Sequence, residues 1–197
     1  MKDMQSFVLG LVSRLSYGDA ISIVQVFEAK SDQVVEFRDS IPNLRTTGRP
    51  VRREKLMLLA LRDSFAKRAK RLTDTTGMKA VVTTDILGFL RRASNYGRTR
   101  GNRKVVIVVL SDMLQSVPNL DFERDGVVPT AGWIESQRKS GLVPMLSGAC
   151  MVAVGVDEGT VRATQVKRFW LDYARAAGGD LRSENYRMVM EASEIQC

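Results

Sequence analysis

The sequence predicts an α/β fold in three layers: a mainly parallel β-sheet with one antiparallel hairpin, and helices on both faces. Two apolar runs, 104–110 (KVVIVVL) and 149–156 (ACMVAVGV), show no alternation with polar residues, which is typical of parallel strands covered on both faces. Segments with helical periodicity separate the strands, as in α/β proteins. The length suits one domain, and we expect residues 1–197 to form it.

The N-terminal part of the chain predicts a helix, a hairpin and a second helix. Apolar residues at helical spacing indicate a helix over 3–16. The β-branched segments 20–27 and 33–38 are joined by a short polar link, which favours an antiparallel hairpin. A further helix is expected at about 50–72, with its basic residues mostly off an apolar stripe formed by Leu58, Leu61, Phe65, Ala69 and Leu72.

The C-terminal part adds three more helices around the two apolar strands. The apolar pattern predicts a helix over 85–95, with Thr84 as its N-cap. A short helix is expected near 130–139, between the strands. The last helix ends at Gly178-Gly179, and its predicted buried stripe consists of Val166, Phe169, Trp170, Tyr173, Ala174 and Ala177.

The composition excludes several kinds of chemistry. The chain has no histidine, which excludes Ser-His-Asp and Cys-His catalysis and histidine-ligated zinc. Its two cysteines cannot form a disulfide framework or a four-cysteine zinc site. We expect Cys150 to be an inert thiol in the core, Cys197 to be exposed, and the compartment to be reducing and cytoplasmic. Because no nucleophile is paired with a base, we expect a protein that is not an enzyme.

Positive charge is concentrated in two stretches, 49–71 and 91–104, although the whole chain carries a net charge of only +8. Such a field attracts phosphate, anionic lipid or an acidic protein face. One reading is a solvated basic face, and the other is a surface that binds nucleic acid or an anionic surface. In the second reading, the binding residues would be Arg52, Arg53, Lys67, Arg68, Lys70, Arg71, Arg98, Arg100 and Arg103.

The sequence predicts no membrane span, because no segment approaches the roughly 18 apolar residues that cross a bilayer. The apolar run at 7–12 is short, and Asp3 and Arg14 flank it closely. We therefore expect an amphipathic helix there and not a signal peptide.

Two places carry polar residues where an α/β sheet binds ligands, at the carboxyl ends of its strands. Ser111-Asp112 follows the first apolar strand, and Thr83-Thr84-Asp85 opens the preceding helix. Hydroxyl and carboxylate groups there could coordinate a hard cation such as Mg²⁺. The structural alternative is that Thr84 only caps a helix and that Asp112 only ends a strand. The acidic residues at 121–125 are expected to form a loop, not a metal or acid–base site.

The order of these elements resembles the von Willebrand factor type A domain. The segments that carry the resemblance are 15–27 (LSYGDAISIVQVF), 83–93 (TTDILGFLRRA), 105–113 (VVIVVLSDM), 146–157 (LSGACMVAVGVD) and 169–181 (FWLDYARAAGGDL). The resemblance implies a metal-ion-dependent adhesion site, in which Mg²⁺ is held by an Asp-x-Ser-x-Ser loop, a threonine and an aspartate. The last two correspond to Thr84 and Asp112. A carboxylate of the bound protein typically completes the metal shell in that family.

The chain departs from the family pattern in ways that bear on metal binding. It lacks the family's first strand and its Asp-x-Ser-x-Ser loop. Three explanations stay open: a truncated product, a strand supplied by a partner, or a sheet that closes differently. The helix at about 50–72 is an insertion relative to the family, and Met113 stands where the family often has glycine.

Together these observations predict a non-enzymatic protein-interaction module with an incomplete metal site. The chain alone would hold no cofactor, and Mg²⁺ would bind only if the missing loop were supplied. The alternative is binding of nucleic acid or an anionic surface through 49–71 and 91–104.

Overall fold

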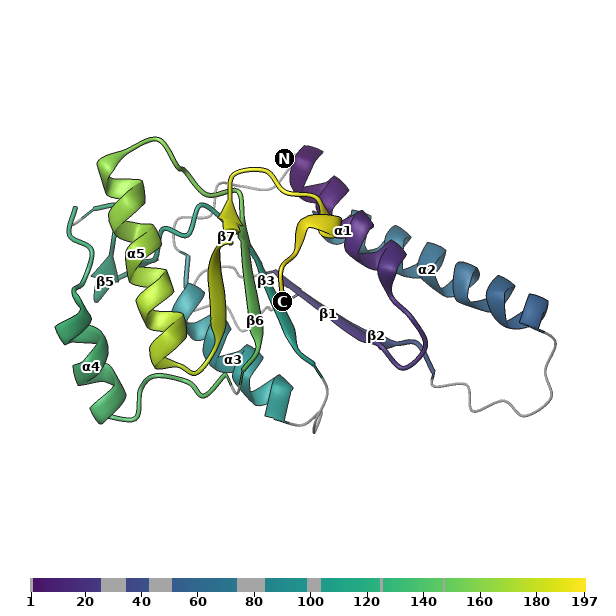
Figure 1. Cartoon of the computed structure of the whole chain (residues 1–197), viewed down its shortest axis with the longest axis horizontal. Helices are drawn as coiled ribbons and strands as arrows, with labels where there is room; N and C mark the ends of the chain where they lie inside the picture. Colours follow the sequence, from purple (N-terminus) through teal and green to yellow (C-terminus); the bar gives the residue numbers. More distant parts are fainter. Residues whose placement is uncertain are drawn as a thin grey trace. The chain divides into compact units, whose positions relative to one another are not determined.

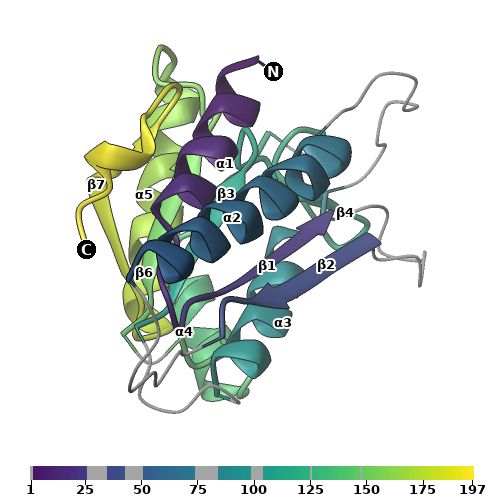
Figure 2. The same ribbon diagram turned by 90° about the vertical axis from the view of Figure 1, so that its right-hand side faces the viewer.

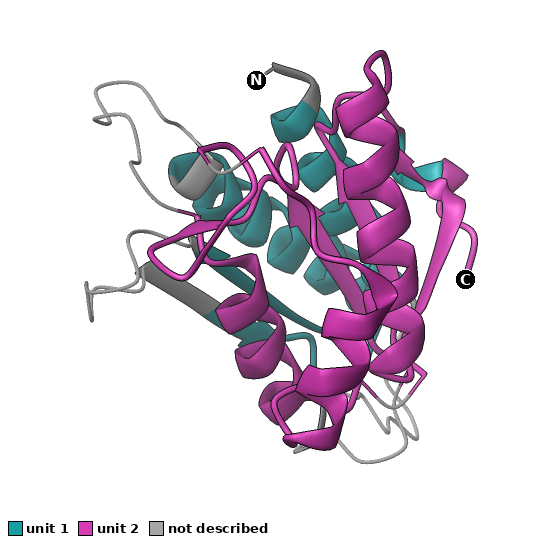
Figure 3. Cartoon of the chain, turned by 90° about the vertical axis from the view of Figure 1, so that its left-hand side faces the viewer, with its two compact units in different colours: residues 1–25, 31–80, 191–193 teal, residues 26–30, 81–190, 194–197 magenta. Residues whose placement is uncertain are grey.

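The structure is a computed structural model that describes residues 2–25, 35–42, 51–73, 84–98, 104–124, 126–146 and 148–197. The chain divides into two compact units, which Figure 3 shows in separate colours. Unit 1 comprises residues 1–25, 31–80 and 191–193, and unit 2 comprises residues 26–30, 81–190 and 194–197. The organisation of residues 1–197 as a single domain remains a prediction.

Unit 1 contains the two helices and the hairpin expected from the N-terminal part of the chain. Its elements are α1 (Lys2–Arg14), β1 (Ala20–Gln25), β2 (Val35–Ser40) and α2 (Val51–Thr73). The strands pair in antiparallel register from Ala20 opposite Ser40 to Gln25 opposite Val35. The hairpin is therefore confirmed, while the polar link between its strands lies outside the described residues.

The two helices of unit 1 pack against each other (Figure 2). Phe7 and Val12 of α1 are buried, as are Phe65 and Ala69 of α2. The inner face of α2 is also held by polar contacts, since the Arg62 Nε–H donates to the Leu15 carbonyl at 2.7 Å. Phe65 and Ala69 of the predicted apolar stripe thus lie on the inward face of α2, Leu58 and Leu61 are partly buried, and the Leu72 side chain lies outside what the structure describes.

Unit 2 is built on a parallel three-stranded sheet, so the α/β class is confirmed. The strands are β3 (Val106–Leu110), β6 (Cys150–Val154) and β7 (Asp180–Arg187), in the spatial order β3-β6-β7 (Figure 1). Its helices are α3 (Ile86–Arg98), α4 (Ala131–Lys139) and α5 (Val161–Ala176). A small antiparallel pair, β4 (Ser116–Val117) with β5 (Leu120–Asp121), follows β3. A 3₁₀ turn at Ala192–Glu194 lies close to the C-terminus.

The core of unit 2 joins the sheet to all three of these helices. Ile107 and Val109 of β3 belong to it together with Met151 of β6. Trp170 of α5 is fully buried, and its ring lies edge-on to Phe169 with centroids 5.0 Å apart. The helical stripe predicted for α5 is therefore its core face. The arrangement of helices on both faces of one sheet remains a prediction.

The expectation that both apolar strands are covered on both faces holds for β6 and is wrong for β3. Every residue of β6 is buried, whereas burial alternates along β3 and Val106 is 43% exposed. The difference in burial follows from the position of each strand in the sheet. In the described part of the chain β6 is the middle strand, while β3 is an outer strand with a neighbour on one side only.

The strand β7 was not predicted, and its pairing with β6 is irregular. The register shifts between Met151 and Ala153, whose partners are Leu181 and Tyr186. Buried Asn185 lies in this irregular stretch, and its amide donates to the Gln196 carbonyl at 2.7 Å and accepts from the Gln196 N–H at 3.0 Å. The Asn185 side chain thus holds the C-terminal segment beside the sheet.

The cysteines are not free thiols. Cys150 and Cys197 form a disulfide with Cα atoms 5.6 Å apart, so the expectation of an inert thiol at Cys150 is wrong, whereas Cys197 is exposed as expected. The pairing arises because the C-terminal segment returns to β6, which a separation of 47 residues does not reveal. A disulfide is typical of oxidising compartments. The prediction of a cytoplasmic location assumed reduced cysteines, and the disulfide removes that support.

Candidate recognition rim

The predicted site residue Thr84 lies beside the segment that follows β3. Its N–H donates to the Ser116 carbonyl at 3.0 Å, and its own carbonyl accepts from the Ser116 N–H at 2.9 Å. Thr84 is therefore held by its backbone, and its expected role as the N-cap of α3 is wrong. The cap is Asp85, whose Oδ1 accepts from the Gly88 N–H at 2.8 Å.

A buried glutamine that the sequence analysis missed completes the start of α3. Gln115 Oε1 accepts from the N–H groups of Ile86 and Leu87, at 2.8 and 3.1 Å. The Gln115 amide then donates to Asp85 Oδ1 at 3.3 Å. The first amides of a helix are its unpaired donors. Because side chains of the protein accept from these amides, the start of α3 is bonded within the protein and is not an anion site.

Asp112 lies at the carboxyl end of β3 in a tightly bonded turn. Its Oδ1 accepts from the Leu114 N–H at 2.9 Å and from the Ser111 hydroxyl at 3.2 Å. The same hydroxyl oxygen accepts from the Met113 N–H at 3.1 Å. The Asp112 residue itself is exposed. The turn thus holds a carboxylate at the surface with one oxygen already bonded.

Met113 takes an unusual backbone conformation next to this carboxylate. Its φ is 63°, in the left-handed region that costs a residue with a side chain roughly 1–2 kcal/mol. Two contacts hold it there: its side chain is completely buried, and its carbonyl accepts from Trp170 Nε1–H at 2.8 Å. Strained residues of this kind are enriched at functional sites.

A second turn follows β6 and leads into α5. Asp157 Oδ1 accepts from the Gly159 N–H at 2.9 Å, and Oδ2 accepts from the Thr160 hydroxyl at 3.2 Å. These bonds, the Gly159 amide first, lower the pKa of Asp157. Thr160 caps α5 by accepting from the Ala163 N–H at 3.0 Å. Glu158, between them, is exposed.

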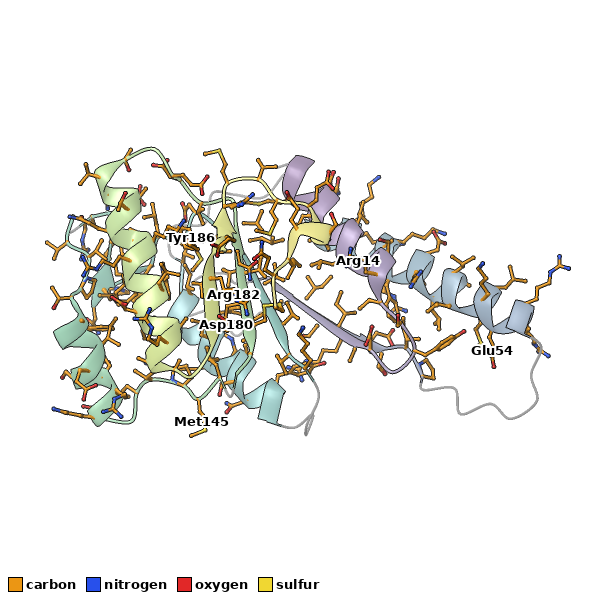
Figure 4. The ribbon with its side chains drawn as sticks, in the orientation of Figure 1. Arg14, Glu54, Met145, Asp180, Arg182 and Tyr186 are labelled. Atoms are coloured by element: carbon orange, nitrogen blue, oxygen red, sulfur yellow. A yellow bond between two sulfur atoms is a disulfide. The ribbon has the colours of Figure 1, made fainter. Side chains whose placement is uncertain are left out.

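The two turns follow the carboxyl ends of β3 and β6, parallel strands whose last residues, Leu110 and Val154, are paired. Tyr186 is a buried residue near the carboxyl end of β7, the third strand of the same sheet. Burial raises the pKa of its hydroxyl above the ordinary value, and the carboxylates of Asp112 and Glu158 raise it further. The parallel register places Asp112, Glu158 and Tyr186 at the same edge of the sheet. In Figure 4, Tyr186 is labelled towards one end of this strand, and Asp180 and Arg182 towards the other. We call Asp112, Glu158 and Tyr186 the recognition rim.

Thr84 and Asp112 remain predicted ligands of a metal ion. Asp112 and Thr84 come from neighbouring segments, but among the residues described no group of three or more Asp, Glu, Cys or His side chains is placed to hold a metal ion. Asp121, in the expected acidic loop, directs its Oδ1 to the amides of Glu123 and Arg124, at 2.9 and 2.8 Å. Its role is structural.

Comparison with known proteins adds no relative. Models of protein families, characterised proteins and solved structures were all searched, and none matches this chain. The resemblance to the von Willebrand factor type A domain therefore remains a prediction.

The predicted basic residues come from two stretches of the chain, 49–71 and 91–104. The two stretches fall in different units, since α2 belongs to unit 1 and α3 to unit 2. The α2 residues are all exposed, and they are Arg52, Arg53, Lys67, Arg68, Lys70 and Arg71. The Arg98 side chain, Arg100 and Arg103 lie outside what the structure describes.

Within the described ranges, no helix has the length and apolar character needed to cross a membrane.

Proposed function

We propose that this chain is a non-enzymatic protein-interaction module, similar to a von Willebrand factor type A domain, that binds a partner protein at the recognition rim. The observation that supports this most strongly is that exposed Asp112 and Glu158 follow the carboxyl ends of the paired parallel strands β3 and β6. The carboxyl ends of parallel strands are where open α/β sheets bind ligands. Helices on both faces of the sheet and an incomplete metal site belong to the same proposal.

The bonding of the rim supports recognition over catalysis. The Ser111 hydroxyl donates to Asp112 and accepts from the Met113 amide. The Thr160 hydroxyl donates to Asp157 and accepts from a helix amide. A nucleophile needs a base that takes its proton, and these hydroxyls are instead fixed in turns. The groups left for a partner are exposed carboxylates on a rigid support.

The proposal is tested by photo-crosslinking from defined positions. A photo-reactive residue is installed at Asp112 or at Glu158. In a matched control it replaces Asp180, whose side chain is 46% exposed at the amino end of β7. We expect the same protein adduct from both rim positions and none from the control. Once the partner is purified, Asp112→Ala should weaken its binding by about tenfold or more, as expected for a central interface residue.

Two results would overturn the assignment. Equal adducts from the rim and from Asp180 would indicate unspecific encounters. An adduct whose purified partner binds Asp112→Ala as well as the unaltered chain would place the interface elsewhere. Chelator is included in a parallel reaction, because the proposed recognition does not depend on a bound metal ion.

A further inference from the structure

The outward face of α2 combines cations with two exposed leucines. At 100° per residue, the positions 52, 56, 59, 63, 67 and 70 form one stripe along this helix. The stripe lies opposite buried Phe65 and Ala69, which face inward. At 1.5 Å per residue, the 23 residues of α2 extend over about 35 Å. The face is thus a long, continuous strip.

The two leucines are the feature that a solvated basic helix does not explain. Leu56 is 60% exposed and Leu59 is 51% exposed. They lie one turn apart, and Arg52, Arg53 and Lys55 surround them at the same end of the helix. An apolar pair flanked by cations is suited to a surface that offers both hydrocarbon and negative charge.

Charge along the rest of the strip is positive overall. Lys67, Lys70 and Arg71 are exposed near the other end of α2. The acidic residue on this face, Asp63, lies 2.7 Å from Lys67 Nζ, so it is neutralised by a neighbour on its own helix. The strip therefore presents positive charge at both ends and leucines within it.

We propose that the outward face of α2 lies on an anionic lipid surface, with Leu56 and Leu59 inserted at the boundary between headgroups and acyl chains. Helices that bind membranes in this way lie in the plane of the interface and have cations around an apolar face. Each lysine or arginine near an anionic leaflet adds attraction. This inference goes beyond protein recognition at the rim, because the rim belongs to unit 2 and α2 belongs to unit 1.

Nucleic acid fits this strip less well than lipid does. Binding to single strands depends on aromatic side chains that stack on bases, and the aromatic residue of α2, Phe65, is buried. Binding to a duplex depends on contacts from cations to phosphate, in which exposed Leu56 and Leu59 would have no role. The leucines therefore distinguish the two partners experimentally.

The anchoring of α2 in unit 1 allows the strip to be tested in the full chain. The Tyr17 hydroxyl donates to the Glu54 carbonyl, and Arg62 contacts the Leu15 carbonyl. Figure 4 labels Glu54 on α2 and Arg14 at the end of α1. Substitutions at Leu56 and Leu59 leave these contacts untouched, so the variants should fold normally. Circular dichroism and a melting curve establish this before binding is measured.

The experiment is sedimentation of the full chain with vesicles. Vesicles of phosphatidylcholine and phosphatidylserine in a ratio of about 2:1 are compared with pure phosphatidylcholine, at low and high salt. We expect binding to the anionic vesicles only. Leu56→Ser/Leu59→Ser should weaken it by about tenfold or more, because interfacial binding scales with the apolar area inserted. The matched control, Leu142→Ser, changes a leucine that is 46% exposed in unit 2 and should bind normally.

A second pair of variants tests the contribution of the cations beside the leucines. Arg52→Glu/Arg53→Glu should reduce vesicle binding, whereas Arg168→Glu, at an exposed position of α5, should not. Lack of binding to anionic vesicles would overturn the proposal. It would also be overturned if the double leucine variant bound vesicles as well as the unaltered chain. Duplex RNA or DNA that binds the leucine variant and the unaltered chain equally, and more tightly than vesicles do, would assign the strip to nucleic acid.

Discussion

Reduction of the disulfide between Cys150 and Cys197 is expected to destabilise unit 2. The bond closes a loop of 47 residues between β6 and the C-terminus. In the reduced protein the same segment is still held by Asn185, which exchanges two hydrogen bonds with Gln196. We therefore expect the folded structure to survive reduction. The unfolded chain gains conformational entropy, because its loop is no longer closed.

The loop length sets the size of the effect. In the chain-entropy model, closing a loop of this length stabilises the folded state by about 4 kcal/mol at 25 °C. Measured values commonly fall between about 2 and 4 kcal/mol, and we expect the free energy of unfolding to decrease by an amount in this range. The unfolded reduced chain also exposes more surface, so the denaturant m-value should increase.

Both tryptophans of the chain, Trp133 and Trp170, lie in unit 2, so their fluorescence reports its unfolding. Denaturant curves are recorded for the oxidised chain, the chain with a reductant, and Cys197→Ser. The last two should coincide, with their midpoint at lower denaturant. Equal midpoints for all three would refute the reasoning. Two free thiols in the intact mass of the non-reduced chain would show that the bond does not form.

Three further outcomes are expected. Gln115→Leu should lower the free energy of unfolding by about 2–3 kcal/mol, because two helix amides lose their acceptor. Gln165→Leu, at an exposed position, should change the free energy of unfolding little, and equal denaturation midpoints for the two variants would contradict the prediction. Burial raises the pKa of Tyr173 from 10.0 to about 12, so the stability that its protonated hydroxyl contributes is complete below pH 10 and is lost as the pH rises through about 12. Tyr173→Phe should flatten the fall in the free energy of unfolding between these two pH values, and an unchanged slope would argue against this prediction. Micromolar Mg²⁺ should not raise the melting temperature beyond the ordinary effect of salt, and a clear rise would show that other oxygen ligands complete a site with Thr84 and Asp112.

The elements that the sequence predicts well are those whose signal is local. The stripe on α5 repeats at helical spacing over the whole element, and the continuous apolar run marks β6 wherever the strand is placed. The hairpin of β1 and β2 depends on two neighbouring segments and a short link, which sequence order alone brings together. Asp112 was identified for a similar reason, because it directly follows a strand.

The features that escaped prediction depend on distant partners. The strand β7 is mostly polar (DLRSENYR), and it is held by its position beside β6 and not by an apolar pattern. Gln115 is a polar residue in a loop until its contact with the start of α3 makes it a buried cap. Glu158 follows β6 as Asp112 follows β3, so the strand-end rule that identified Asp112 could also have found it. The polar strand and the buried cap required the folded structure.

A hydrogen bond from Trp170 to Met113 links the recognition rim to the core of unit 2. Trp170 is packed among aromatic rings in the core, and its indole N–H also holds the Met113 carbonyl at 2.8 Å. Met113 is the residue with the left-handed backbone, and it directly follows Asp112. Because the energy of core packing is much larger than the roughly 1–2 kcal/mol cost of that conformation, the core can impose it on the turn. The orientation of the exposed carboxylate is thus determined from inside the protein, which a surface loop without such an anchor could not achieve.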